Sequence, residues 1–124
     1  MRLSDLLLIL VSVALSASGQ LLLKLGASAP AVRGAIAGGA PGERLVALAT
    51  TPALVGGLMV YALSAAAWIV VLSKLDLSLA YPFVGLGFVV TFLIGVLLLG
   101  EPASAGRLAG TLLIAGGAVL VARG

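Results

Sequence analysis

The chain has 124 residues, of which 62% are hydrophobic and only 9% are charged, and its formal net charge is +3. A soluble domain of this length exposes a large share of its residues and could not hide so much apolar surface, so we expect the surrounding solvent to be lipid. His and Cys are both absent, which excludes His/Cys metal sites, thiol nucleophiles, disulfides and a Ser-His-Asp triad. The seven basic residues are scattered, so we expect no nucleic-acid partner. We also expect no metal, no cofactor and no enzymatic activity.

Four segments are long and apolar enough to cross a bilayer, which takes about 20 residues in a helix. They cover about residues 5–25, 52–73, 77–99 and 103–122. The links after the second and third spans are short, so the last three helices should be antiparallel neighbours in a compact bundle. The sequence therefore predicts an all-α membrane protein whose residues 1–124 form a single four-helix transmembrane domain.

The first link, residues 26–51, is long and rich in Gly, Ala and Pro. We interpret it as a loop, within which a short interfacial helix could form near residues 43–49. The first span is too long for a signal peptide and three more spans follow, so we expect it to remain in the mature protein. Orientation is poorly specified, because an inside N-terminus leaves three basic residues inside and four outside. An antiparallel dimer would follow if the chain inserts both ways.

A row of polar side chains runs along the first span. Four of them stand at four-residue intervals, which stacks them on one helix face: Ser12, Ser16, Gln20 and Lys24. The serines could simply bond within their own helix or mark close packing, and Lys24 could snorkel to the interface. The amide of Gln20 is harder to accommodate, because its donors and acceptor need partners in hydrocarbon. We interpret the row as one wall of a polar crevice that leads from mid-membrane to a cationic mouth.

Aromatic residues mark the second and third spans. Tyr61 and Trp68 are two helical turns apart and share one face of the second span. Trp68 is deep in the span, where its indole N–H needs a partner. Tyr81 opens the third span and fits an interfacial aromatic belt equally well.

Small residues follow in the third span. Pro82 is expected to open this helix, where its missing N–H costs little. Gly85 and Gly87 remove side chains, which allows either a bend or plain close packing of helices. A bend would serve alternating access, so these three residues are candidate hinge residues.

The fourth span carries glycines on one face. Gly106 and Gly110 form a GxxxG pair, and Gly117 lies seven residues after Gly110. This spacing predicts a helix dimerisation interface. Glu101 and Arg107, near the start of the span, could pair or cap there, and neither demands a catalytic role.

Three stretches resemble the drug/metabolite transporter superfamily. They are "GQLLLKLG" in the first span, "AYPFVGLGFV" in the third and "LGEPASAGRLAGTLLIAGG" leading through the fourth. The chain is most similar to the four-helix members with an EamA-like bundle: the small multidrug resistance proteins and the ArnE/ArnF-type subunits that flip aminoarabinose-phosphoundecaprenol. The resemblance covers the chain except for the long first link.

One position separates these two branches. Small multidrug resistance proteins carry a membrane-embedded Glu three residues before the Gly that corresponds to Gly19, and here Ser16 stands at that position. No Asp or Glu lies in the core of any expected span, so proton-coupled cation export would lack its titratable carboxylate. The "GQ…K" of the first span, Trp68, "AYP" and "EP.S" match the flippase branch. Gly85 and Gly87 are similar to the glycine hinge of the multidrug branch.

The resemblance and the polar row together predict a flippase of a polyprenyl-phosphate-linked sugar, or a related lipid, in the bacterial inner membrane. We expect Ser16 and Gln20 to bind the headgroup, Lys24 to bind the phosphate, and Trp68 and Tyr81 to stack on the sugar or form chamber walls. Four helices enclose little volume, so we expect a homodimer or a pair with a four-helix paralogue. Two alternatives stay open: an exporter of small polar or cationic metabolites, and a non-transporting membrane subunit that scaffolds a partner.

Overall fold

The structure is a computed structural model that describes residues 2–124, and every regular element among them is helical. In chain order the elements are α1 (Leu3–Ala27), α2 (Pro30–Gly38), α3 (Pro41–Thr50), α4 (Pro52–Lys74), α5 (Leu77–Ala80), a 3-10 turn (Tyr81–Phe83), α6 (Val84–Leu97) and α7 (Ala105–Arg123). Four segments are long and apolar enough to cross a membrane: Leu3–Ala27, Pro52–Lys74, Leu77–Leu97 and Ala105–Arg123. The prediction of an all-α fold with four spans is confirmed.

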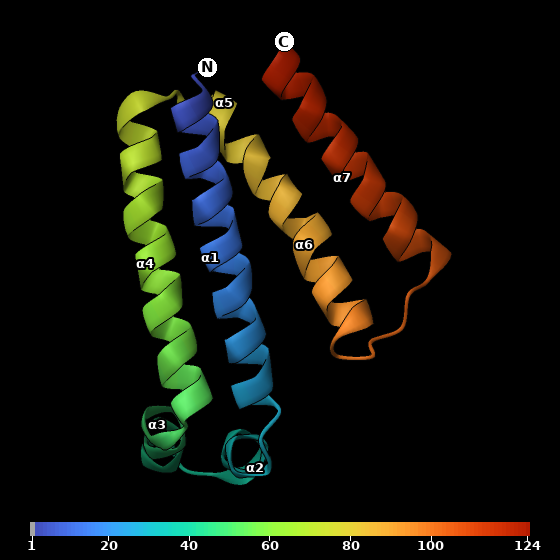
Figure 1. Ribbon diagram of the computed structural model, residues 1–124. Coiled ribbons are helices and arrows are strands. Elements are labelled where there is room, and N and C mark those ends of the chain that lie inside the picture. The colour runs from blue at the N-terminus through green and yellow to red at the C-terminus, as the bar shows by residue number, and fades with distance from the viewer. Residues whose placement is uncertain (1) are drawn as a thin grey trace.

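The four spans are not equally close to one another. α1 and α4 pack side by side along their whole length, and they form the most extensive contact between elements (Figure 1). α6 approaches α1 near the N-terminal end of α1 and diverges from it toward the other end, and α7 packs on α6 and leans further out. Both chain termini lie at the same end of the bundle, as four antiparallel spans require. The divergence of α6 from α1 leaves room for the site described below.

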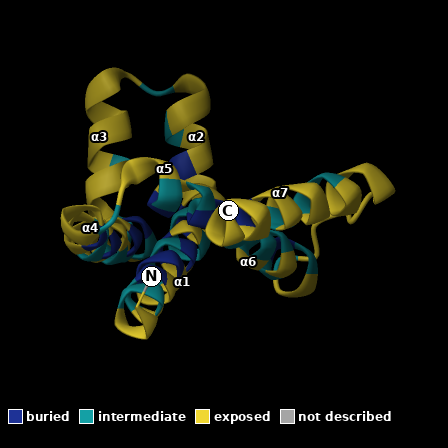
Figure 2. Cartoon of the chain, turned by 90° about the horizontal axis from the view of Figure 1, so that it is seen from above, coloured by how far each residue is buried: buried dark blue, intermediate teal, exposed yellow. Residues whose placement is uncertain are grey.

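A small core holds the narrow end of this bundle together. Its buried members come from α1, α4, α5 and the 3-10 turn: Ile9, Val13, Val71, Ala80 and Phe83. Figure 2 shows buried residues gathered where α1, α4 and α5 meet, while α7 and the helices α2 and α3 are mostly exposed. In α7 the one buried residue is Ala118. The exposed surface of the spans is apolar, as a lipid-facing surface must be.

Two helices occupy most of the first link, so the interpretation of residues 26–51 as a loop was wrong. α2 and α3 each begin with a proline at the first helical turn, and α4 begins in the same way. Pro30, Pro41 and Pro52 are therefore helix starts, because proline presets the helical φ and its missing N–H has no partner in the first turn. The short helix expected near residues 43–49 is part of α3. Both helices lie at the ends of α1 and α4, where Figure 1 views them end-on, and Figure 2 shows them extending to one side of the spans.

The third span is interrupted. Pro82 does not open this helix, as was expected, but lies in the 3-10 turn between α5 and α6. Proline fits here because it stands in the first turn of the 3-10 segment, where its missing N–H costs little. The turn places Tyr81 and Phe83 beside the core: Phe83 is buried and Tyr81 is exposed.

Two glycines in the first turn of α6 lie where neighbouring helices approach. A Cβ atom at Gly85 would stand 2.8 Å from Cγ2 of Ile114 in α7, and a Cβ at Gly87 would stand 3.4 Å from Cγ1 of Val13 in α1. Both contacts fit the packing alternative for these residues. A hinge at Pro82, Gly85 and Gly87 stays a prediction.

Candidate functional site

A crevice of about 760 Å³ lies between α1, α4 and the segment from the 3-10 turn to the α6–α7 link. Its lining includes all five residues predicted from the sequence to bind substrate: Ser16, Gln20, Lys24, Trp68 and Tyr81. The first three come from α1, Trp68 comes from α4 and Tyr81 comes from the 3-10 turn. Helix packing thus gathers polar and aromatic side chains from three parts of the chain around one space, and their role in binding stays a prediction.

The polar row of α1 divides into a structural half and an open half. Ser12 is buried, and its hydroxyl donates a hydrogen bond to the carbonyl of Ser64 in α4 at 3.0 Å, so it joins the two helices instead of bonding within its own. Ser64 in turn donates to the carbonyl of Tyr61 at 2.6 Å. Among the described residues, the side chains of Ser16 and Gln20 have no hydrogen-bond partner, and Gln20 is exposed. The amide of Gln20 is therefore available to a molecule in the crevice.

An aromatic pair lies toward the narrow end of the crevice. The rings of Trp68 and Tyr81 meet edge to face, with centroids 6.4 Å apart and planes inclined by 69°. Trp68 packs against the buried core on one side and lines the crevice on the other. Tyr81 is 60% exposed, so its ring and hydroxyl are accessible from the crevice.

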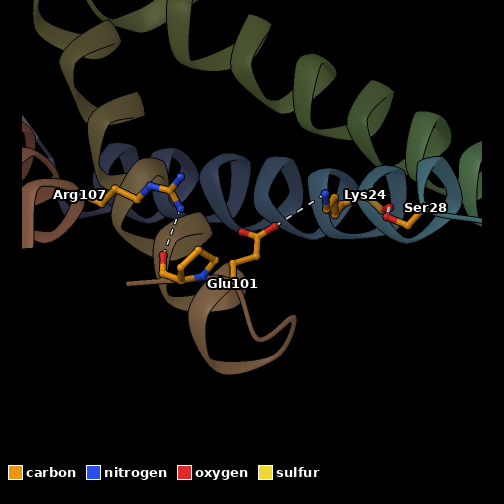
Figure 3. A network of polar contacts seen from close by, with 5 residues as sticks. Lys24, Ser28, Glu101 and Arg107 are labelled. Atoms are coloured by element: carbon orange, nitrogen blue, oxygen red, sulfur yellow. Dashed lines mark hydrogen bonds and ion pairs between the residues drawn. The ribbon is translucent and has the colours of Figure 1, made fainter. Parts of the chain in front are cut away.

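A charged pair lies at the wide end of the crevice. Nζ of Lys24 is 3.8 Å from Oε2 of Glu101, and the two side chains point toward one another across the space between α1 and the α6–α7 link (Figure 3). The sequence suggested that Glu101 and Arg107 could pair or cap at the start of the fourth span, and the pairing is wrong, because Glu101 pairs with Lys24. The guanidinium of Arg107 donates to the carbonyl of Pro102 at 3.1 Å, and its amide is capped by the hydroxyl of Ser104.

Glu101 was missed as a crevice residue because it lies outside every span in the sequence. The turn after α6 brings it back. Gly100 has a φ of 67°, which glycine adopts freely, and the amide of Glu101 donates to the carbonyl of Gly95 at 2.9 Å. Gly95 has no side chain, and a Cβ atom there would overlap the Glu101 carboxylate and stand 3.3 Å from its Cδ. The only signal in the sequence was a Gly on α6 at the right distance before the "GEP" turn.

The three glycines predicted to form a dimer interface lie on an uncovered surface of α7. Apart from the backbone of α7 itself, no atom lies within 4 Å of a Cβ built at Gly106, Gly110 or Gly117. None of them is used for packing within this bundle. Their face is free to meet another helix, and the dimer itself stays a proposal.

A four-span helical bundle with a polar crevice between its spans defines a multi-pass membrane protein. The family model of the Small Multidrug Resistance protein matches residues 47–114, more than half of the chain, and the chain belongs to this family. The matched residues run from α3 into α7 and do not include the polar row of α1. This is a family of membrane transport proteins, in line with the expectation that the chain is not an enzyme.

Curated relatives point to a particular branch. Three of them are each named probable 4-amino-4-deoxy-L-arabinose-phosphoundecaprenol flippase subunit ArnF. The relative from Shewanella sediminis is 43% identical over 77 residues, covering 60% of this chain and 53% of the relative. Those from Erwinia tasmaniensis and Enterobacter sp. are 41% and 42% identical, covering 57% and 56% of this chain and 58% and 56% of the relatives. The chain thus spans about half the length of the curated relatives it matches, and no solved structure gives a significant match.

Proposed function

We propose that the protein moves a polyprenyl-phosphate-linked sugar, or a closely related lipid, across the bacterial inner membrane for assembly of the cell envelope. The observation that carries this proposal is the crevice: it is lined by a free amide at Gln20, a cation at Lys24 and an aromatic pair, all between apolar spans. The relatives, whose name specifies a lipid-linked amino sugar as the molecule flipped, support the same reading.

The chemistry of such a lipid matches the lining. A sugar headgroup must leave water and pass through hydrocarbon, so it needs donors and acceptors along its route. Ser16 and Gln20 offer a hydroxyl and an amide to sugar hydroxyls, and Lys24 offers a compact cation to the phosphate. The ring faces of Trp68 and Tyr81 suit the apolar face of a sugar. The crevice volume of about 760 Å³ is within the range of roughly 300–1,000 Å³ that is usual for small-molecule sites.

We further propose that the working unit is a homodimer or a pair with a second four-helix chain. A single copy leaves the glycine face of α7 uncovered, and no residue of α7 lines the crevice. The relatives, which are named as subunits, support assembly with a partner.

The test is flipping of a polyprenyl-phosphate sugar in liposomes that contain the chain, alone or with a second four-helix chain from the same genome. Gln20→Leu and Lys24→Ala should abolish flipping without loss of folding. The amide of Gln20 has no partner among the described residues, so leucine leaves no group unpaired. The ion pair of Lys24 with Glu101 is half-exposed and contributes little to stability. Lys24→Arg should retain part of the activity and Lys24→Glu should be worse than Lys24→Ala, since a carboxylate repels the phosphate. Wild-type rates in both Gln20→Leu and Lys24→Ala would contradict the proposal. They would mean that the serines of the row only pack against other helices and that Lys24 only extends to the membrane interface.

A further inference from the structure

The ion pair at the wide end of the crevice is loosely made. Lys24 and Glu101 are 3.8 Å apart, and their side chains are 56% and 42% exposed. Among residues 2–124, no other side-chain hydrogen bond holds either charged group. Half-exposed pairs of this kind contribute little to stability, at most about 1 kcal/mol. Both charges can therefore exchange this contact for a better one.

Glu101 nevertheless has a defined position. Its amide is bonded to the carbonyl of Gly95, and the missing side chain of Gly95 leaves the space that its carboxylate occupies. The other acidic residues of the chain, Asp5, Glu43 and Asp76, do not line the crevice. One carboxylate is thus built into a crevice that otherwise offers a cation and neutral polar groups.

We propose that Lys24 and Glu101 together recognise a headgroup that carries both an anionic phosphate and a cationic amine. This inference rests on the proposed function and deepens it. The name of the relatives already specifies an amino sugar, and what the geometry adds is that Glu101 is the residue that selects for the amine. In the empty crevice the two charges neutralise one another. In the occupied crevice Lys24 binds the phosphate and Glu101 binds the ammonium group, so each charge has a partner of opposite sign. A sugar ring separates the two charges of the substrate, so binding draws Glu101 away from Lys24.

A neutral sugar phosphate would fit this site poorly. Its phosphate would bind Lys24, and the Glu101 carboxylate would then face the headgroup without a cation. A carboxylate without a cation beside a phosphate is repelled by it. The site therefore discriminates against the analogue that lacks the positive charge as well as favouring the amine.

The experiment measures binding in nanodiscs through the fluorescence of Trp68, which is the one Trp of the chain and lines the crevice. The probes are a short-chain isoprenyl phosphate linked to a 4-aminopentose and the same molecule with its amine acetylated. We expect wild-type protein to prefer the free amine by about tenfold, as for one charge-assisted contact. Glu101→Gln should bring the ratio near one by weakening binding of the free amine. Lys24→Gln should weaken both probes.

Two further variants sharpen the result. Gly95→Ala pushes the Glu101 carboxylate out of its place and should lower the ratio, because it weakens binding of the free-amine probe more than binding of the acetylated probe. Glu43→Gln removes a carboxylate outside the crevice and should leave the ratio unchanged.

Equal binding of both probes by wild-type protein would overturn the inference and leave the proposed function intact. An equal loss of both probes in Glu101→Gln would also overturn it, since the pair would then only fix the α6–α7 link. Failure of wild-type protein to bind either probe would instead contradict the proposed function.

Discussion

Gly19 and Gly57 lie against one another at the crossing of α1 and α4. A Cβ atom at Gly19 would stand 3.1 Å from the carbonyl oxygen of Gly57, and a Cβ at Gly57 would stand 3.1 Å from the carbonyl oxygen of Gly19. Contacts this short to backbone atoms cannot be relieved by turning a side chain. Small residues are what allow two helix backbones to meet inside a bilayer, where no hydrophobic effect drives them together. This contact holds α4 and its aromatic residues against the polar row of α1.

The first prediction compares two adjacent glycines of α4. Gly57→Ala should destabilise the protein by about 1–3 kcal/mol, because the added methyl group meets the backbone of α1. Gly56→Ala is the matched control: its Cβ would have one neighbour, at 4.0 Å, so alanine should be neutral or should stabilise by up to about 1 kcal/mol through helix propensity. Unfolding by denaturing detergent measures both. Equal stability of the two variants would contradict the close crossing.

The second prediction concerns the serine that joins these helices. Ser12→Ala removes a buried hydrogen bond to the carbonyl of Ser64 and should cost about 0.5–1.5 kcal/mol. Ser18→Ala is the control, because the Ser18 hydroxyl is exposed and bonds only to the carbonyl of Ala14 in its own helix. The same unfolding assay applies. A loss as large in Ser18→Ala as in Ser12→Ala would mean that the cross-helix bond adds nothing.

The third prediction tests the proposed self-association. Leu at Gly110 or Gly117 adds bulk to an uncovered face and should weaken a helix contact that depends on small residues, without affecting folding of the single copy. Gly116→Leu is the control, because its position is equally open but points away from the predicted face. Crosslinking or energy transfer in bilayers gives the dimer fraction. Unchanged association in both test variants would contradict the prediction and would mean that the glycine face of α7 contacts lipid.

The fourth prediction concerns proton coupling. Ser16 lines the crevice where the multidrug branch carries its Glu, and a hydroxyl does not exchange protons near neutral pH. We therefore expect no efflux of ethidium driven by a pH gradient from vesicles that contain only this protein. Efflux at a rate comparable to that of a small multidrug resistance protein measured in parallel would contradict the expectation. It would also direct attention to Glu101 as the alternative carboxylate.

The sequence alone was sufficient for the overall class and for much of the candidate site. Four apolar runs of the right length can only be spans, because a bilayer requires every backbone polar group to be satisfied within a helix. The row that ends in Gln20 and Lys24 follows from helical periodicity, which fixes the face of a residue on its own helix. The first link was interpreted as a loop because it is rich in proline, but proline is also a favoured first residue of a helix, and Pro30 and Pro41 start α2 and α3.

What only the tertiary structure decided is which faces meet. Helical periodicity places Ser12 and Ser16 on one face of α1, but only the packing of α4 buries the first and leaves the second in the crevice. Periodicity likewise identifies glycines without showing that Gly19 touches α4 and that Gly110 touches nothing. Glu101 lies 77 positions after Lys24 in the sequence, and the left-handed turn at Gly100 brings its carboxylate to the same crevice. The sequence determines each helix by local geometry, whereas a site made by several helices depends on contacts between residues that are distant in the chain.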